Sequence, residues 1–93
     1  MPEPPLERRA AALSYQPGDR APRVVATGRG HIADRILTAA REAGVPVRED
    51  AALVEALGAL DLGREIPEAL YQAVAETLAW AYRLDLRMSK RLR

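Results

Sequence analysis

The sequence predicts an α/β domain with α+β character, in which a small mixed sheet of four strands is covered by three to four helices. Residues 23–27, RVVAT, form a β-branched run between a proline and a glycine, which is typical of a buried strand. Between residues 67 and 82, apolar residues recur at helical spacing and give one broad apolar face. Strand-like and helix-like segments alternate along the chain, and this order indicates helices packed on a partly parallel sheet.

The composition excludes several classes of protein. The chain has 93 residues, enough for one domain with a single core, and its 48% hydrophobic and 29% charged residues are typical of a globular protein. The absence of cysteine excludes disulfides and thiol chemistry. The sequence contains no apolar run of about 20 residues, so we expect no transmembrane segment and a cytoplasmic protein. The net charge of +1 makes no general case for a nucleic-acid or membrane partner.

The first half of the chain predicts three strands and one helix. Residues 1–9 are rich in proline and are expected to be a flexible lead-in. Residues 10–15 are interpreted as a strand, with a helical first turn as the alternative, because alanines give a weak strand signal. After the strand at 23–27, residues 31–43 have helical periodicity, and Gly44 is expected to close that helix in a left-handed conformation. Val45, Pro46 and Val47 then predict a short edge strand.

The second half predicts two more helices. Asp50 is expected to cap a short helix that carries leucines on one side. A strand-like stretch at Glu65 and Ile66 follows, and Pro67 is placed at the first position of the last helix, where its missing N–H costs nothing. Tyr71 lies beside the apolar face of this helix. We therefore divide the chain into the lead-in 1–9, a domain at 10–84 and a basic tail at 85–93.

The sequence offers few groups for catalysis. Gly28, Arg29 and Gly30 lie between a strand and a helix, where backbone amides can hold a phosphate, but the remaining residues of the nucleotide-binding patterns are missing. Close packing of strand and helix is the competing explanation for Gly28. His31 is the only histidine, so no multi-histidine metal site can form, and Glu65 is a candidate acceptor for loop amides. We expect no catalytic residue, metal or cofactor.

The C-terminal end is the clearest charge asymmetry and the candidate interaction surface. It carries one acidic residue, Asp85, against five basic ones: Arg83, Arg87, Lys90, Arg91 and Arg93. Such a run is either a solvated terminus or a surface attracted to an acidic protein, anionic lipid or RNA. Trp80 lies on a different side of the helix from Val74 and is either a docking residue or part of the core.

Several motifs together resemble the soluble C-terminal domain of the flagellar and type III secretion export-switch family, the FlhB family. The residues that carry this resemblance are Tyr15-Gln16-Pro17, Ala21-Pro22-Arg23-Val24-Val25-Ala26-Thr27-Gly28, Gly44-Val45-Pro46, Gly63-Arg64-Glu65-Ile66-Pro67 and Leu70-Tyr71-Gln72-Ala73-Val74-Ala75. The resemblance covers roughly residues 10 to 82 and implies a small mixed sheet surrounded by helices. Gly28, Gly44, Pro46, Glu65, Ile66, Pro67 and Tyr71 are therefore structural motif residues.

The resemblance also implies an activity that this sequence cannot perform. The family cleaves itself in an Asn-Pro-Thr-His loop before the first strand, and that loop would fall at residues 5–8, Pro5-Leu6-Glu7-Arg8. The chain contains no asparagine, so the nucleophile is missing. The resemblance covers only the soluble domain, so we expect a short freestanding homologue without the membrane part.

The resemblance leads to the function that we expect. The chain is expected to be a non-enzymatic protein-interaction module that binds flagellar export-gate components or export substrates, at the periphery of the membrane-bound apparatus. We expect a monomer or a weakly associating protein without a small-molecule substrate. The alternative is a small regulatory or RNA-associated domain that uses the basic tail. An enzymatic interpretation would depend on the glycine loop alone.

Overall fold

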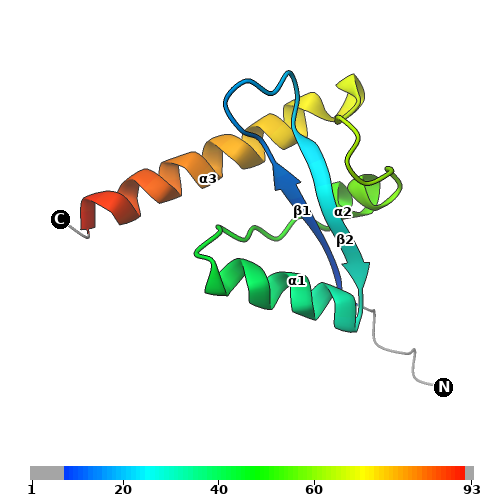
Figure 1. Ribbon diagram of the computed structural model, residues 1–93, viewed down its shortest axis with the longest axis horizontal. Helices are drawn as coiled ribbons and strands as arrows, with labels where there is room; N and C mark the ends of the chain where they lie inside the picture. The colour runs from blue at the N-terminus through cyan, green and yellow to red at the C-terminus, as the bar shows by residue number, and fades with distance from the viewer. Residues whose placement is uncertain (1–7, 92–93) are drawn as a thin grey trace.

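The computed structural model describes residues 8–91, with side chains as far as Leu84. Two strands are followed by helices, and in chain order the elements are β1 (Arg9–Ser14), β2 (Arg23–Arg29), α1 (His31–Glu42), α2 (Ala51–Gly58), a single 3₁₀ turn η1 (Glu68–Leu70) and α3 (Tyr71–Arg91) (Figure 1). The predicted α/β class is thus confirmed, and the three α-helices are close to where periodicity placed them. The predicted flexible lead-in lies mostly outside the described residues.

The two strands form an antiparallel hairpin with a β-bulge. Residues 9–12 pair with residues 29–26 in order, but Leu13 pairs with Val24, so that Val25 is an extra residue on β2. A bulge of this kind interrupts the alternation of side chains along its strand. Gly28 therefore meets α1, whereas Val24 points into the cluster formed with α2 and α3. Val25 is left about half exposed, at 52%.

The prediction of a mixed sheet of four strands is wrong in the number of strands and in their relative direction. Within residues 8–91, the sheet has two strands, which run antiparallel to each other. The predicted strand at 45–47 does not form, because the amide of Val45 bonds to the carbonyl of Ala40 at 2.8 Å and Pro46 has no N–H to donate. The predicted fourth strand is reduced to one bridge, Arg23 with Glu65.

The segment before α3 nevertheless fastens to the outer edge of β2. The amide of Gly63 donates to the carbonyl of Val24 at 2.8 Å, and the amide of Ile66 donates to the carbonyl of Pro22 at 2.9 Å. Pro67 follows at once and cannot donate a further bond, so the pairing ends there. Two backbone bonds are enough to fix Ile66 over the core.

Helix α1 is defined by glycines at both ends. Gly30 precedes it with φ 56° and ψ −124°, a conformation that only glycine adopts readily. At the other end, Gly44 has φ 73°, its amide donates to the carbonyl of Arg41, and the amide of Val45 donates to the carbonyl of Ala40. This pair of bonds is a Schellman motif, and it confirms the left-handed cap predicted at Gly44.

Asp50 caps α2 as predicted. Its Oδ1 accepts a hydrogen bond from the amide of Leu53 at 3.1 Å, which satisfies one of the four free amides at the start of the helix. The cap therefore fixes the first turn, from which Leu53 enters the core.

We expect Asp50→Ala to lower the free energy of unfolding by about 1 kcal/mol, because an amide at the helix start loses its acceptor. Urea denaturation monitored by circular dichroism measures this change. Glu49→Ala is the matched control, since Glu49 is the adjacent exposed carboxylate and makes no capping bond. Equal unfolding midpoints for the two variants would contradict the role of the cap.

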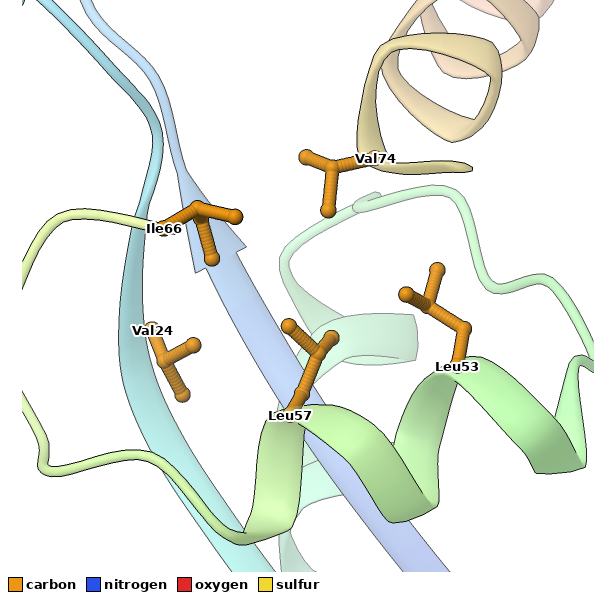
Figure 2. Close-up of a cluster of buried hydrophobic side chains, with 5 residues drawn as sticks. All are labelled: Val24, Leu53, Leu57, Ile66 and Val74. Carbon is orange, nitrogen blue, oxygen red and sulfur yellow. The ribbon is translucent and has the colours of Figure 1, made fainter. Parts of the chain in front are cut away.

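The core joins β2, α2, α3 and the loop before α3 at one point. One cluster contains Val24 from β2, Leu53 and Leu57 from α2, Ile66 from the loop before α3, and Val74 from α3 (Figure 2). Ile66, Val24 and Val74 are at most 2% exposed. Half-buried apolar residues surround this cluster, namely Ala11, Leu13, Leu60, Leu70, Ala73 and Leu78.

Helix α3 begins later than its sequence pattern predicts. Pro67 is extended, with ψ 153°, and precedes η1, so it lies just outside the helix and not at its first position. The helix continues to Arg91, and its C-terminal half runs past the hairpin (Figure 1). Between residues 8 and 91, no helix combines the length and the apolar character needed to cross a bilayer.

Candidate functional site

An open apolar groove separates the connection between the two strands from the first half of α3. Its volume is about 320 Å³. One wall comes from the chain that leaves β1 and enters β2, and the other comes from α3. We call it the tyrosine groove, and it is lined by Tyr15, Arg20, Ala21, Pro22, Tyr71, Val74, Ala75 and Leu78.

The groove has an apolar floor and amphipathic walls. Val74 is 1% exposed and forms part of the floor, whereas Tyr15 and Tyr71 are 55% and 46% exposed. Neither tyrosine hydroxyl bonds to another residue in the described part of the chain. Arg20 is the only charged residue of the lining. An apolar floor with exposed tyrosines and a cation can bury an apolar side chain and bond to the polar groups beside it.

A turn beside each tyrosine positions its side chain at the groove. The amide of Gln16 bonds to the Asp19 carboxylate at 2.9 Å and the amide of Asp19 to the carbonyl of Gln16 at 3.0 Å, which fixes the turn after Tyr15. Tyr71 is placed by η1, whose 3₁₀ turn sets where α3 starts. The sequence predicted Tyr71 beside the apolar face of the helix, and the structure places it at the uncovered edge of that face.

The predicted interaction residues on α3 differ in exposure. Arg83 is exposed, whereas Trp80 is half-buried and lines a second apolar groove of about 210 Å³ between α3, β1 and α1. Arg87, Lys90 and Arg91 belong to α3, and their side chains lie outside the described ones. Trp80 and Arg83 are three positions apart and so are neighbours on α3, but of the two only Arg83 is exposed, and their role in binding stays a prediction.

Within the glycine loop, Gly28 packs closely against α1, whereas no atom lies within 4 Å of a carbon added at Gly30. A Cβ atom on Gly28 would lie 2.7 Å from Cβ of Ile32 and 3.2 Å from the amide nitrogen of Ala33, so strand and helix approach too closely for any side chain. His31 is exposed at the start of α1, and the carboxylate of Glu65 is exposed and accepts no hydrogen bond from the described residues. In residues 8–91, no three acidic or histidine side chains are grouped so that they could hold a metal ion.

The sequence of the chain identifies its family. The model of the FlhB HrpN YscU SpaS family matches residues 7–81, most of the chain. The chain belongs to this family. Its membership confirms the resemblance carried by the glycine, proline and tyrosine motifs, and links the chain to the export-switch proteins of flagella and type III secretion.

Two of the relatives that match the chain differ in length. YlqH of Bacillus subtilis strain 168 is 52% identical over 79 residues, which cover 84% of this chain and 85% of YlqH. The flagellar biosynthetic protein FlhB of Salmonella typhimurium is 44% identical over 77 residues, covering 81% of this chain and 20% of FlhB. The chain thus spans about a fifth of the length of the FlhB relatives that it matches and most of the length of YlqH.

Solved structures of the FlhB family share this fold. The PscU C-terminal domain superposes with a TM-score of 0.72 and 32% identity, covering 83% of this chain and 98% of that domain. A mutated EscU/SpaS C-terminal domain gives a TM-score of 0.76 and 30% identity over 81% of this chain and 95% of that domain. The chain therefore has the fold of the family's C-terminal domain.

The tyrosine groove was not found from the sequence. Several of its residues, Tyr15, Ala21, Pro22 and Tyr71, belong to the motifs that carry the family resemblance. The available signal was the position of two tyrosines at the ends of predicted elements, where side chains are often uncovered. Periodicity alone cannot show that residues 56 positions apart, Tyr15 and Tyr71, face the same opening.

Proposed function

We propose that the chain is a non-enzymatic protein-interaction module of the flagellar type III export apparatus. It works in the cytoplasm, and its partner is an export substrate or an export-gate component. The partner inserts an apolar segment into the tyrosine groove. The family membership supports the export role, and the groove supports the mode of binding.

The observation that carries the proposal is the combination of burial and exposure in the groove. Val74, part of the hydrophobic core, lines the groove together with two tyrosines that are about half exposed and whose hydroxyls bond to no other described residue. Exposed aromatic residues around an apolar floor are enriched in binding sites, because a partner gains apolar contact there without losing the tyrosine hydrogen bonds. Arg20 on the rim favours a partner segment with a carboxylate.

A variant of the groove tests the proposal. Ala75→Glu places a charge in the apolar wall, and we expect it to abolish recovery of an export substrate or export-gate protein on the immobilised chain from flagellated cells, as identified by mass spectrometry. Ala52→Glu is the control, since Ala52 is exposed on α2 and lies outside the groove. Recovery of the same export protein by Ala75→Glu and the unaltered chain would contradict the groove as the site. Recovery of no export protein by the unaltered chain would contradict the export role.

Self-cleavage is not expected. The position of the family's cleavage loop, residues 5–8, holds Pro5-Leu6-Glu7-Arg8, and without an asparagine no side-chain amide there can attack its own main-chain carbonyl. Arg8 is the one residue of this loop in the described part of the chain, and its carbonyl accepts the amide of Gly30 at 2.8 Å. We expect intact-mass spectrometry to give the full mass after prolonged incubation at neutral pH. A fragment that begins between residues 5 and 9 would overturn this expectation.

A further inference from the structure

The outer face of α3 and its preceding turn carries a continuous exposed stripe. Glu68, Gln72, Glu76, Ala79 and Arg83 are all exposed and follow one another at intervals of three or four residues. Residues with this spacing share one side of a helix. Val74, which is 1% exposed, marks the side that faces the core, so the stripe lies on the solvent side of the helix.

Charge changes sign along this stripe. Its first half holds Glu68 and Glu76, and its second half begins at Arg83 and continues at helical spacing with Arg87 and Arg91. The described side chains form two ion pairs, Arg8 with Asp34 and Arg64 with Asp61. Glu76 and Arg83 therefore form no ion pair with another described side chain.

The helix itself does not explain these charges. The dipole of a helix acts on charges in its first and last turns, whereas Glu76 and Arg83 lie more than one turn from either end of α3. Residues three or four positions from Glu76 are uncharged, and Arg83 has Arg87 as its only charged neighbour at this spacing. Pairing within the helix is therefore absent for both residues.

We propose that this stripe is an interface for a second copy of the chain, with the two α3 helices antiparallel. Reversing one helix about the point between Ala79 and Trp80 places Glu76 of each copy opposite Arg83 of the other. The same operation brings Gln72 opposite Arg87 and Glu68 opposite Arg91. A two-fold interface requires such a self-complementary order, in which every contact occurs twice.

The order of the charges selects this partner over a polyanion. An anionic membrane or an RNA strand would attract the basic half of the stripe and repel Glu68 and Glu76. A second copy supplies the reverse order of charge along the same length. Ala79 at the crossing point has a small side chain and lets the two helices approach closely.

The association is weak and depends on ionic strength, because its pairs are exposed to water. It goes beyond the proposed export role and refines the expectation of a monomer or weakly associating protein. The tyrosine groove is a separate surface, since none of the stripe residues lines it.

Sedimentation velocity of the whole chain tests the proposal. We expect a dimer at about 0.01 M ionic strength, where the Debye length is about 30 Å, and a monomer at about 1 M, where it is about 3 Å. Glu76→Arg and Arg83→Glu each place like charges opposite one another and are expected to weaken dimerisation on the order of tenfold or more. The double variant restores both pairs and recovers the dimer.

Mixing the single variants gives the sharpest result. Glu76→Arg and Arg83→Glu have complementary stripes, so their mixture is expected to form a heterodimer although each alone is a monomer. Glu55→Arg, the same charge change at an exposed position of α2, is expected to dimerise like the unaltered chain. Circular dichroism checks that all variants are folded. An unaltered chain that is monomeric at low ionic strength, or a dimer that is insensitive to both single changes, overturns the proposal.

Discussion

Replacing Ile66 by alanine is expected to lower the free energy of unfolding by about 2 to 5 kcal/mol, the cost of removing a buried isoleucine and leaving a cavity. Ile66 is 2% exposed and contacts a cluster supplied by β2, α2 and α3. Its amide is held by the carbonyl of Pro22, so the backbone cannot easily move to fill the space. Since the total free energy of unfolding of a small domain is about 5 to 15 kcal/mol, we expect a large fall in the urea concentration at the unfolding midpoint.

A second isoleucine provides the control for this prediction. Ile32 is 51% exposed, so Ile32→Ala is expected to cost about 1 kcal/mol or less. Ile66→Val removes one methyl group and is expected to cost about 0.5 to 1.5 kcal/mol. Similar midpoints for Ile66→Ala and Ile32→Ala would show that Ile66 does not join the layers as described.

Gly28→Ala is expected to destabilise the chain by about 1 to 3 kcal/mol, because the new methyl group would overlap α1. The added carbon meets Cγ2 and Cβ of Ile32, and it lies 3.2 Å from the backbone nitrogen of Ala33. Ile32 is exposed and its outer carbons can turn away, but its Cβ and the backbone of α1 cannot move alone. Ala33 is fully buried against the hairpin, so the whole helix must shift. Thermal unfolding measures the loss.

Gly58→Ala is the matched control for Gly28→Ala. No atom lies within 4 Å of the carbon added at Gly58, and its backbone is helical. Alanine is a better helix former than glycine, so we expect this variant to be unchanged or stabilised by up to about 1 kcal/mol. Both changes restrict the unfolded chain alike, so the difference between them isolates the contact with α1. Equal stabilities would contradict the close packing of β2 on α1.

Local chemistry in the sequence predicts the helices well. The cap at Asp50 and the left-handed glycine at position 44 depend on neighbouring residues. Both are confirmed, the first by the bond from the Leu53 amide to the Asp50 carboxylate and the second by the backbone bonds that end α1. Sheet size depends on partners far along the chain, which periodicity does not contain. The apolar residues at 45–47 predict a strand, but the Schellman bond of Val45 and the missing amide of Pro46 remove the donors that a strand needs.

The candidate site is less predictable than the fold. Motif residues such as Pro22 and Tyr71 could be recognised in the sequence, but their exposure depends on how α3 crosses the strand connection. The basic residues at the C-terminal end were visible as a run of charge. Their relation to Glu68 and Glu76 becomes apparent only when all of them are placed on one helix.

The extra residue Val25 limits which sequence changes this hairpin can accept during evolution. Helices pack on both sides of β2. The bulge reverses the side-chain direction along the strand, so that Gly28 packs against α1 and Val24 packs against α2 and α3. Many side chains would be acceptable at position 25, because it is half exposed. Deleting the residue would instead rotate Val24 out of the core. This site should therefore accept substitutions but reject insertions and deletions.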